Sequence, residues 1–131
     1  MSGVVRLNSG TPWEGIVGYS RVVVRGDAAW VSGTTSTVHG VVVHPGDAAA
    51  QTRQALAIVR AALERAGFTL ADVVRTRMFV TDISRWEEVG RVHGDVFGDV
   101  RPATTMVQVA ALIDPALLVE IEADAVRGAG A

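Results

Sequence analysis

The end of the chain carries the most regular pattern of apolar and polar positions. Over residues 117–126, valine, isoleucine and alanine alternate with Glu120, Glu122 and Asp124, from Val119 onwards. A period of two places one class of side chain on each face of a β-strand. The pattern therefore predicts a final strand with one apolar face and one acidic face.

A period of three to four residues predicts a long helix in the middle of the chain. Asp47 follows a Pro-Gly pair and is a suitable N-cap, and Gly67 is a suitable residue to follow the last turn. Between them, one side of the helix carries small and apolar residues: Thr52, Ala55, Leu56, Val59, Ala62, Leu63 and Ala66. Such a one-sided amphipathic helix needs a sheet to cover.

Shorter runs predict the other elements. We expect strands over 3–8, 19–26, 28–35, 72–82 and 100–112, and a second helix over about 84–98. Gly26 and Asp27 favour a hairpin turn between the second and third strands. Loops or turns are expected at 9–18 and 113–116, a frayed tail at 127–131, and either a loop or extended chain at 36–46.

Three of these elements carry further detail. One face of the strand over 72–82 is expected to hold Val74, Thr76, Met78 and Val80, and the other Arg75, Arg77 and Phe79. Ser84 and Glu87 have the spacing of a capping box, and the helix after them is expected to bury Trp86, Val89, Val96 and Phe97. The strand over 100–112 has no charged residue after Arg101, which favours a buried strand.

The order of elements is β-β-β-α-β-α-β-β. It predicts an α+β two-layer domain over residues 1–131, with a mixed sheet and both helices on one face. The strands joined through helices are expected to run parallel to each other. The uncovered face allows two interpretations, either solvated ion pairs between its acidic row and arginines, or association of several copies.

Composition excludes several function classes. The 131 residues contain no cysteine, which excludes disulfides, thiolate catalysis and cysteine-ligated metals. The formal net charge is −2 and no basic run occurs, which argues against nucleic-acid binding. We see no secretory signal and no apolar run of membrane-spanning length, and we expect a cytoplasmic protein. His39, His44 and His93 lack metal-ligand spacing.

The sequence resembles the reactive intermediate deaminase family, also called YjgF-like. The segment RPATTMVQVAAL, at 101–112, and LLVEIEADAV, at 117–126, are similar to its C-terminal signature. Residues 18–35 and 49–83 are similar to its N-terminal hairpin and to its long helix with the following strand. The resemblance implies a chorismate-mutase-like subunit, a homotrimer with ligand clefts between subunits, and hydrolysis of imino or enamino acids without cofactor or metal.

Site residues are carried over by the same resemblance. Tyr19 matches the family tyrosine, which would contact a small planar ligand, or would simply cover the core. Ser32 and Gly33 match a Ser-Gly pair, which would contact the ligand or form a strand-end turn. Glu120 matches a glutamate that would activate water or move a proton. Structural pairing of Glu120 with Arg75 or Arg77 is the alternative.

The departure from the family pattern is at Thr104. The family places an arginine directly after Pro-Ala, and its guanidinium holds the substrate carboxylate. Arg101 lies three residues earlier and points to the opposite face of an extended strand, so it is a poor replacement. Arg21, Arg75 or Arg77, of this subunit or a neighbour, remain candidates. A pocket lined by Thr104 favours an uncharged or less acidic ligand.

These observations support three functional hypotheses. The first is a trimeric hydrolase or deaminase of a small imine, enamine or related C–N bond, with Tyr19, Ser32, Gly33, Thr104 and Glu120 in its cleft. The second is a non-catalytic module on the same fold, which binds a metabolite or a protein partner. The third is a ribonuclease, which the net charge disfavours.

Overall fold

The computed structural model describes residues 3–128 of the chain. Its main sheet contains β1 (Val4–Leu7), β2 (Val22–Arg25), β3 (Ala28–Thr34), β6 (Val73–Val80), β7 (Ala103–Gln108) and β8 (Val119–Val126). The helices are α1 (Ala48–Arg65) and α2 (Trp86–Phe97), and β4 (Thr37–Val38) pairs with β5 (Val41–Val42) in a small hairpin. Short helical turns occupy Glu14–Gly18, Leu70–Asp72 and Ile83–Arg85.

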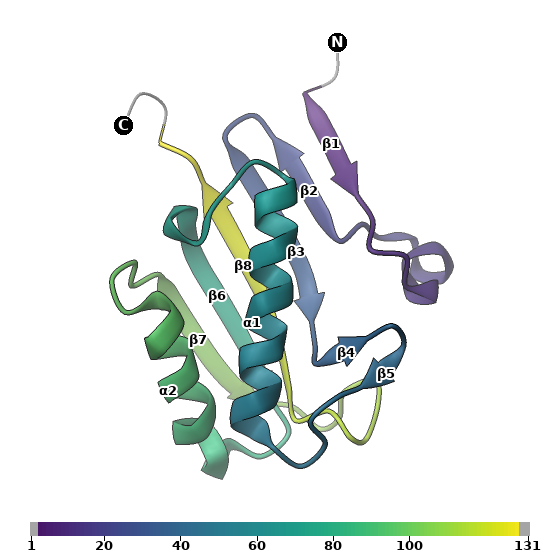
Figure 1. Ribbon diagram of the computed structural model, residues 1–131, viewed down its shortest axis with the longest axis vertical. Coiled ribbons are helices and arrows are strands. Elements are labelled where there is room, and N and C mark those ends of the chain that lie inside the picture. The colour runs from purple at the N-terminus through teal and green to yellow at the C-terminus, as the bar shows by residue number, and fades with distance from the viewer. Residues whose placement is uncertain (1–2, 129–131) are drawn as a thin grey trace.

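The sheet has the strand order β1-β2-β3-β8-β6-β7. Only β6 and β7 pair in parallel, with Thr76 opposite Thr104. Because β3 and β6 both pair antiparallel to β8, they run in the same direction with β8 between them. Both helices lie on one face, with α1 across the middle of the sheet and α2 beside it near β7 (Figure 1). The predicted α+β class and mixed sheet are confirmed.

The long helix forms for the expected reasons. The Asp47 side chain accepts a hydrogen bond from the Ala50 amide at 3.0 Å, and Gly67 ends the helix with φ of +86°. The predicted stripe is buried against the sheet, with Leu56, Val59 and Leu63 almost inaccessible to water. This packing joins α1 to β3 and β8, the strands that carry the candidate site.

The start of the second helix differs from the prediction. Asp82, not Ser84, supplies the capping side chain, and its carboxylate accepts from the Ser84 amide at 3.0 Å and hydroxyl at 2.6 Å. A helical turn then precedes α2, which leaves Trp86 exposed. Val89 and Phe97 are buried as predicted, Val96 is partly buried, and Val92 and His93 join them in place of Trp86. The capping-box pattern was therefore misleading. In such a box the Glu87 side chain would accept from the Ser84 amide, but Asp82 takes that hydrogen bond.

Two strands also depart from the expected faces. A register shift between Val73 and Arg75 turns Val73 into the core and leaves Val74 exposed. In β7, all residues but Met106 are exposed, so the prediction of a buried strand is wrong for the isolated subunit. The physical reason is position, since β7 is the edge strand and pairs with β6 alone.

The predicted frayed tail at 127–131 is wrong for its first residue, because Arg127 is held in place. Its guanidinium donates to the carbonyls of Gly67 and Gly26, each at 3.0 Å, and stacks over the Phe68 ring at 4.1 Å. Arg127 thus ties the end of β8 to the turn after α1 and to the β2–β3 turn. Residues 129–131 lie outside the described part.

We expect Arg127→Ala to lower the free energy of unfolding by about 2 kcal/mol, because two charge-assisted hydrogen bonds and a cation–π contact are lost. Arg60→Ala is the control, since its pair with Glu64 lies on the exposed face of α1 and contributes only about 0.3–0.5 kcal/mol. Urea unfolding at one protein concentration measures both. Equal losses would show that the Arg127 contacts contribute nothing beyond an ordinary surface ion pair.

No helix within residues 3–128 combines the length and apolar character needed to cross a lipid bilayer.

Candidate functional site

A cavity of about 970 Å³ opens beside the ends of β3 and β8. Its walls come from the loop before β2, the β4–β5 hairpin, one flank of α1 and the segment before β8. Tyr19, Ser32, Gly33 and Glu120 all line it, so four of the five predicted site residues meet in one subunit. Trp13 lines it as well.

The loop that carries Trp13 and Tyr19 is held by a buried carboxylate. Glu14 accepts hydrogen bonds from the Ser9 amide at 3.0 Å, the Thr11 hydroxyl at 2.9 Å and the Ser9 hydroxyl. Burial disfavours the charged form, but these hydrogen bonds outweigh it and hold the pKa of Glu14 below its ordinary value. The loop is therefore anchored around an ionised side chain.

A bulge in β3 shapes the floor of the cavity. The pairing of β3 with β8 shifts register between Val31 and Thr34, which sets Ser32 and Gly33 out of the regular ladder. The Ser32 hydroxyl donates to the Ser20 carbonyl at 2.5 Å, and the Ser32 amide donates to the Arg21 carbonyl at 3.0 Å. Ser32 thus lines the cavity, but its hydroxyl proton is already used to join the bulge to the loop.

Gly33 makes room for Glu120. A Cβ atom at Gly33 would lie 2.1 Å from Oε2 of Glu120, well inside van der Waals contact. Any side chain at this position would therefore push the carboxylate away. The bulge and the glycine together place the Glu120 carboxyl group against the backbone of β3.

The acidic row of β8 is divided by its partners. Arg77 on β6 pairs with Glu122 at 3.2 Å and with Asp124 at 3.4 Å. Within residues 3–128, no hydrogen bond or ion pair holds the carboxylate of Glu120. Burial raises the pKa of Glu120 above its ordinary value, Arg21 opposes this increase, and Glu122 adds to it. Of the two interpretations of Glu120, the ion pair with Arg75 or Arg77 is not formed.

Arg21 is the arginine that enters the cavity. It is only 6% exposed, and its Nη1 donates to the Gly33 carbonyl at 2.9 Å, the Thr34 hydroxyl at 2.6 Å and the Ser32 carbonyl at 3.2 Å. Its Cζ lies 6.0 Å from the centre of the Tyr19 ring. The sequence left three arginines as candidates for this position, and Arg21 is the one among the cavity residues.

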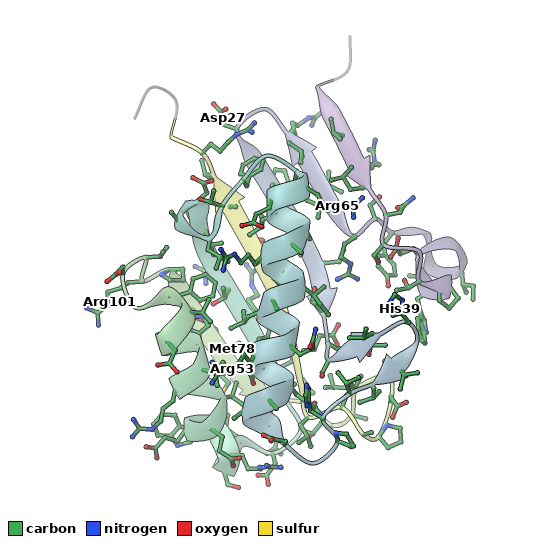
Figure 2. The ribbon with its side chains drawn as sticks, viewed as in Figure 1. Asp27, His39, Arg53, Arg65, Met78 and Arg101 are labelled. Carbon is green, nitrogen blue, oxygen red and sulfur yellow. The ribbon has the colours of Figure 1, made fainter. Side chains whose placement is uncertain are left out.

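Thr104 does not reach this cavity within one subunit. It lies on β7, separated from β3 by β8 and β6. Its hydroxyl bonds to the Thr76 hydroxyl and donates to the Thr76 carbonyl at 3.2 Å. The Thr76 hydroxyl also bonds to Nε2 of His93 at 2.8 Å, and burial lowers the pKa of His93. Arg101 does not line the cavity either, and it lies on the opposite side of the molecule from His39 of the cavity wall (Figure 2).

Comparison with known proteins agrees with this architecture. A family model described as endoribonuclease L-PSP matches residues 11–127. The crystal structure of Rv2704 from Mycobacterium tuberculosis, a member of the YjgF/YER057c/UK114 family, is 55% identical with a TM-score of 0.87, and the match covers 95% of this chain and 99% of that one. This chain belongs to the YjgF/RidA family. The predicted family and its chorismate-mutase-like fold are confirmed.

Two further relatives of this YjgF/RidA chain are associated by name with small molecules. The 3-aminoacrylate deaminase RutC of Acinetobacter baylyi is 41% identical over 80 residues, which span 61% of this chain and 63% of that protein. The crystal structure of TdcF from Escherichia coli, with bound serine, is 27% identical with a TM-score of 0.78 and covers 94% of each chain.

Two cavity residues of this YjgF/RidA chain escaped the sequence analysis or were left undecided. His39, noted from the sequence only for its lack of metal-ligand spacing, lines the cavity because the β4–β5 turn folds towards the N-terminal loop, and no local pattern signals that contact. Arg21 follows Tyr19 by two residues, and that spacing in extended chain puts both side chains on one side. No group of three or more histidine and acidic side chains within residues 3–128 could hold a metal ion.

Proposed function

We propose that this chain is a small-molecule hydrolase that releases ammonia from a reactive imine or enamine, in a cleft shared by the subunits of a homotrimer. The observation that carries the proposal is the environment of the Glu120 carboxyl group. Its carboxyl group lines the cavity, is set apart from the ion pairs of its neighbours, and has a raised pKa because of burial. A buried carboxyl group with a raised pKa suits proton transfer, because it keeps its proton at a higher pH than an exposed one does.

The proposed chemistry needs only water and a proton carrier. Glu120 in its ionised form accepts a proton as water adds to the imine carbon, and a new C–O bond forms. The protonated carboxyl then returns the proton to nitrogen, which completes a carbinolamine. Glu120 next takes the proton of the new hydroxyl group and delivers it to nitrogen, so the C=O bond forms as the C–N bond breaks, and a carbonyl compound and ammonia leave. Tyr19 lies beside the cavity, where its ring and hydroxyl would hold a planar substrate.

The relatives support this reaction class. The substrate in the name of RutC, 3-aminoacrylate, is an enamine that carries a carboxylate, and its deamination is the same net hydrolysis. The serine bound to TdcF shows that a related chain accommodates an amino acid. Both likenesses support a small polar ligand of amino-acid size for this chain.

The proposed trimer is supported by the sheet. Its uncovered face carries Trp30, Phe79 and Val107, and β7 presents uncharged, exposed side chains at the edge. A neighbouring subunit packed there would cover this apolar surface. We propose that Thr104 contributes to the cleft from the neighbouring subunit, since it does not reach the cavity of its own.

Ammonia release tests the function. A 2-imino acid is generated from leucine by an amino acid oxidase, and ammonia or loss of the imine is followed with and without the purified chain. We expect hydrolysis at least tenfold faster than in buffer. No acceleration on imines with or without a carboxylate would reject the hydrolase, and stoichiometric metabolite binding in that case would identify a binding module. Because the matching family is described as an endoribonuclease, RNA cleavage is a further assay. Degradation of RNA by the purified chain would favour the ribonuclease.

We expect Gly33→Ala to lower the rate of imine hydrolysis about 10–100-fold, because the new methyl group displaces the Glu120 carboxylate. The fold should remain stable, since only the end of a flexible side chain has to move. Gly15→Ala is the matched control, because a Cβ there meets no atom within 4 Å. Equal rates for wild type and Gly33→Ala would show that the carboxylate does not act from this position.

A further inference from the structure

The Arg21 guanidinium is a buried cation that interacts electrostatically with Glu120 but forms no ion pair with it. Within residues 3–128, none of the ion pairs involves Arg21, and its hydrogen bonds go only to neutral oxygens of Ser32, Gly33 and Thr34. Burying a cation without a directly bonded counter-ion is costly, and a bound anion lowers that cost. The arrangement therefore favours a ligand with negative charge.

The bonding of Arg21 leaves part of the guanidinium available. All three of its hydrogen bonds use Nη1, so Nε and Nη2 have no partner within residues 3–128. Every fully buried side-chain nitrogen or oxygen in that range does have a partner, so Nε and Nη2 reach accessible surface. Because Arg21 lines the cavity, this edge of the guanidinium is available to a ligand there.

The charged neighbours of Arg21 are consistent with an anionic ligand. Glu122 also lines the cavity, but its charge is compensated by Arg77 at 3.2 Å. Glu120 is the remaining acid of the cavity wall, and Arg21 acts on its pKa through space, but no ion pair joins the two side chains, so the guanidinium still lacks a directly bonded carboxylate. The Tyr19 ring lies 6.0 Å from Cζ of Arg21 and helps to orient the guanidinium.

We propose that Arg21 is the anion anchor of the cavity and holds the carboxylate of a small substrate through Nε and Nη2. These two nitrogens form the planar edge that matches a carboxylate in a two-point contact. Nη1 of Arg21 and Oε2 of Glu120 both lie against Gly33, so the anchor and the proton carrier share one wall of the cavity. A substrate with its carboxylate next to the reacting C–N bond fits this spacing.

The proposal deepens the proposed function and rests on its cavity, and it changes one expectation. The absence of an arginine at Thr104 favoured an uncharged ligand. With Arg21 in the cavity, the carboxylate site is supplied by the residue that precedes β2 instead of by β7.

The test measures binding without turnover, so that its outcome does not depend on hydrolysis. The affinity of 2-oxobutanoate, a keto acid of the product class, is compared with that of 2-oxobutanamide, its uncharged counterpart, by calorimetry or NMR titration. We expect the acid to bind wild type at least tenfold more tightly than the amide. In Arg21→Gln we expect the two affinities to agree within threefold, with the amide unchanged.

Arg25→Gln is the matched control, because it removes the same charge from an exposed position at the end of β2 outside the cavity. It should keep the preference of wild type for the acid. A direct readout that needs no variant fold is the Nε–H resonance of Arg21, which should shift with the acid and not with the amide.

Several results would overturn the anchor: no preference in wild type, a preference retained in Arg21→Gln, or an unmoved Nε–H resonance. Failure of the hydrolase would be separate from these. Acid-selective binding that depends on Arg21, without ammonia release, would retain the anchor and reject the hydrolase. Ammonia release from carboxylate-bearing imines at the same rate in Arg21→Gln would retain the hydrolase and reject the anchor.

Discussion

Glu120→Gln is expected to lower the rate of imine hydrolysis about 10²–10⁴-fold, which is the usual contribution of a general acid–base residue. Glutamine keeps the size of the side chain and its ability to hydrogen-bond, but it cannot accept and return a proton. Substrate binding should change little, because Arg21, and not Glu120, is the proposed anchor. Steady-state ammonia release under saturating substrate measures the effect.

Asp124→Asn provides the matched control. Asp124 belongs to the same acidic row of β8, but it pairs with Arg77 at 3.4 Å and does not line the cavity. We expect its rate to remain within about threefold of wild type. Equal losses in the two variants would show that the effect comes from the charge of the sheet and not from the position of Glu120.

The pH dependence of Glu120→Gln adds an independent check on the same carboxyl group. Because burial raises the pKa of Glu120 in the folded state, the folded chain favours the protonated form. Stability from that proton is fully present at low pH and is lost as pH rises through the raised pKa. The glutamine variant does not ionise at this position. The difference in melting temperature, variant minus wild type, should therefore increase from acidic to neutral pH. A constant difference would contradict the raised pKa.

Val107→Asp is expected to dissociate the proposed trimer into monomers. Val107 lies on the edge strand β7, opposite Phe79 of the uncovered face, and is 42% exposed in the isolated subunit. If a neighbouring subunit covers it, the variant buries an unpaired carboxylate, which costs at least about 3 kcal/mol at each interface. Light scattering at micromolar concentration should report a threefold loss of mass, and loss of activity should accompany it because the cleft is shared.

Ile83→Asp is the control for this variant. Ile83 is an apolar residue of similar exposure, at 40%, but it lies in the turn before α2 and not on the uncovered sheet face. This variant should stay trimeric. A monomeric wild type, or a Val107→Asp variant of unchanged mass, would reject the interface on β7.

Much of the fold was predictable because burial leaves a local periodic pattern. The stripe of Leu56, Val59 and Leu63 and the alternation of β8 each report a buried face directly, and both were confirmed. The errors occurred where neighbouring residues compete for one role. Asp82 displaced Ser84 as the capping residue, and a register shift exchanged Val73 for Val74 in the core.

Four of the five candidate site residues could be placed in one cavity from the sequence, but their arrangement could not be predicted. The resemblance to the family indicated Tyr19, Ser32, Gly33 and Glu120, and the structure brings them to one cavity. It could not indicate that the Ser32 hydroxyl donates to the Ser20 carbonyl. Nor could it indicate that Arg77 pairs with Glu122 and Asp124, so that within residues 3–128 Glu120 has no ion pair. Those outcomes depend on strand register, which links residues far apart in the chain.

The amino-acid sequence by itself determined the elements, the two-layer class and the family, because periodicity and motifs are properties of neighbouring residues. Only the tertiary structure decided which charges meet. Strand order placed Thr104 two strands away from β8 and its cavity residues, and the packing around the β3 bulge brought Arg21 and Glu120 against the same residue, Gly33. The physical reason is that charged side chains interact through space. Folding decides which of them become neighbours, and such neighbours can lie about a hundred residues apart in the sequence.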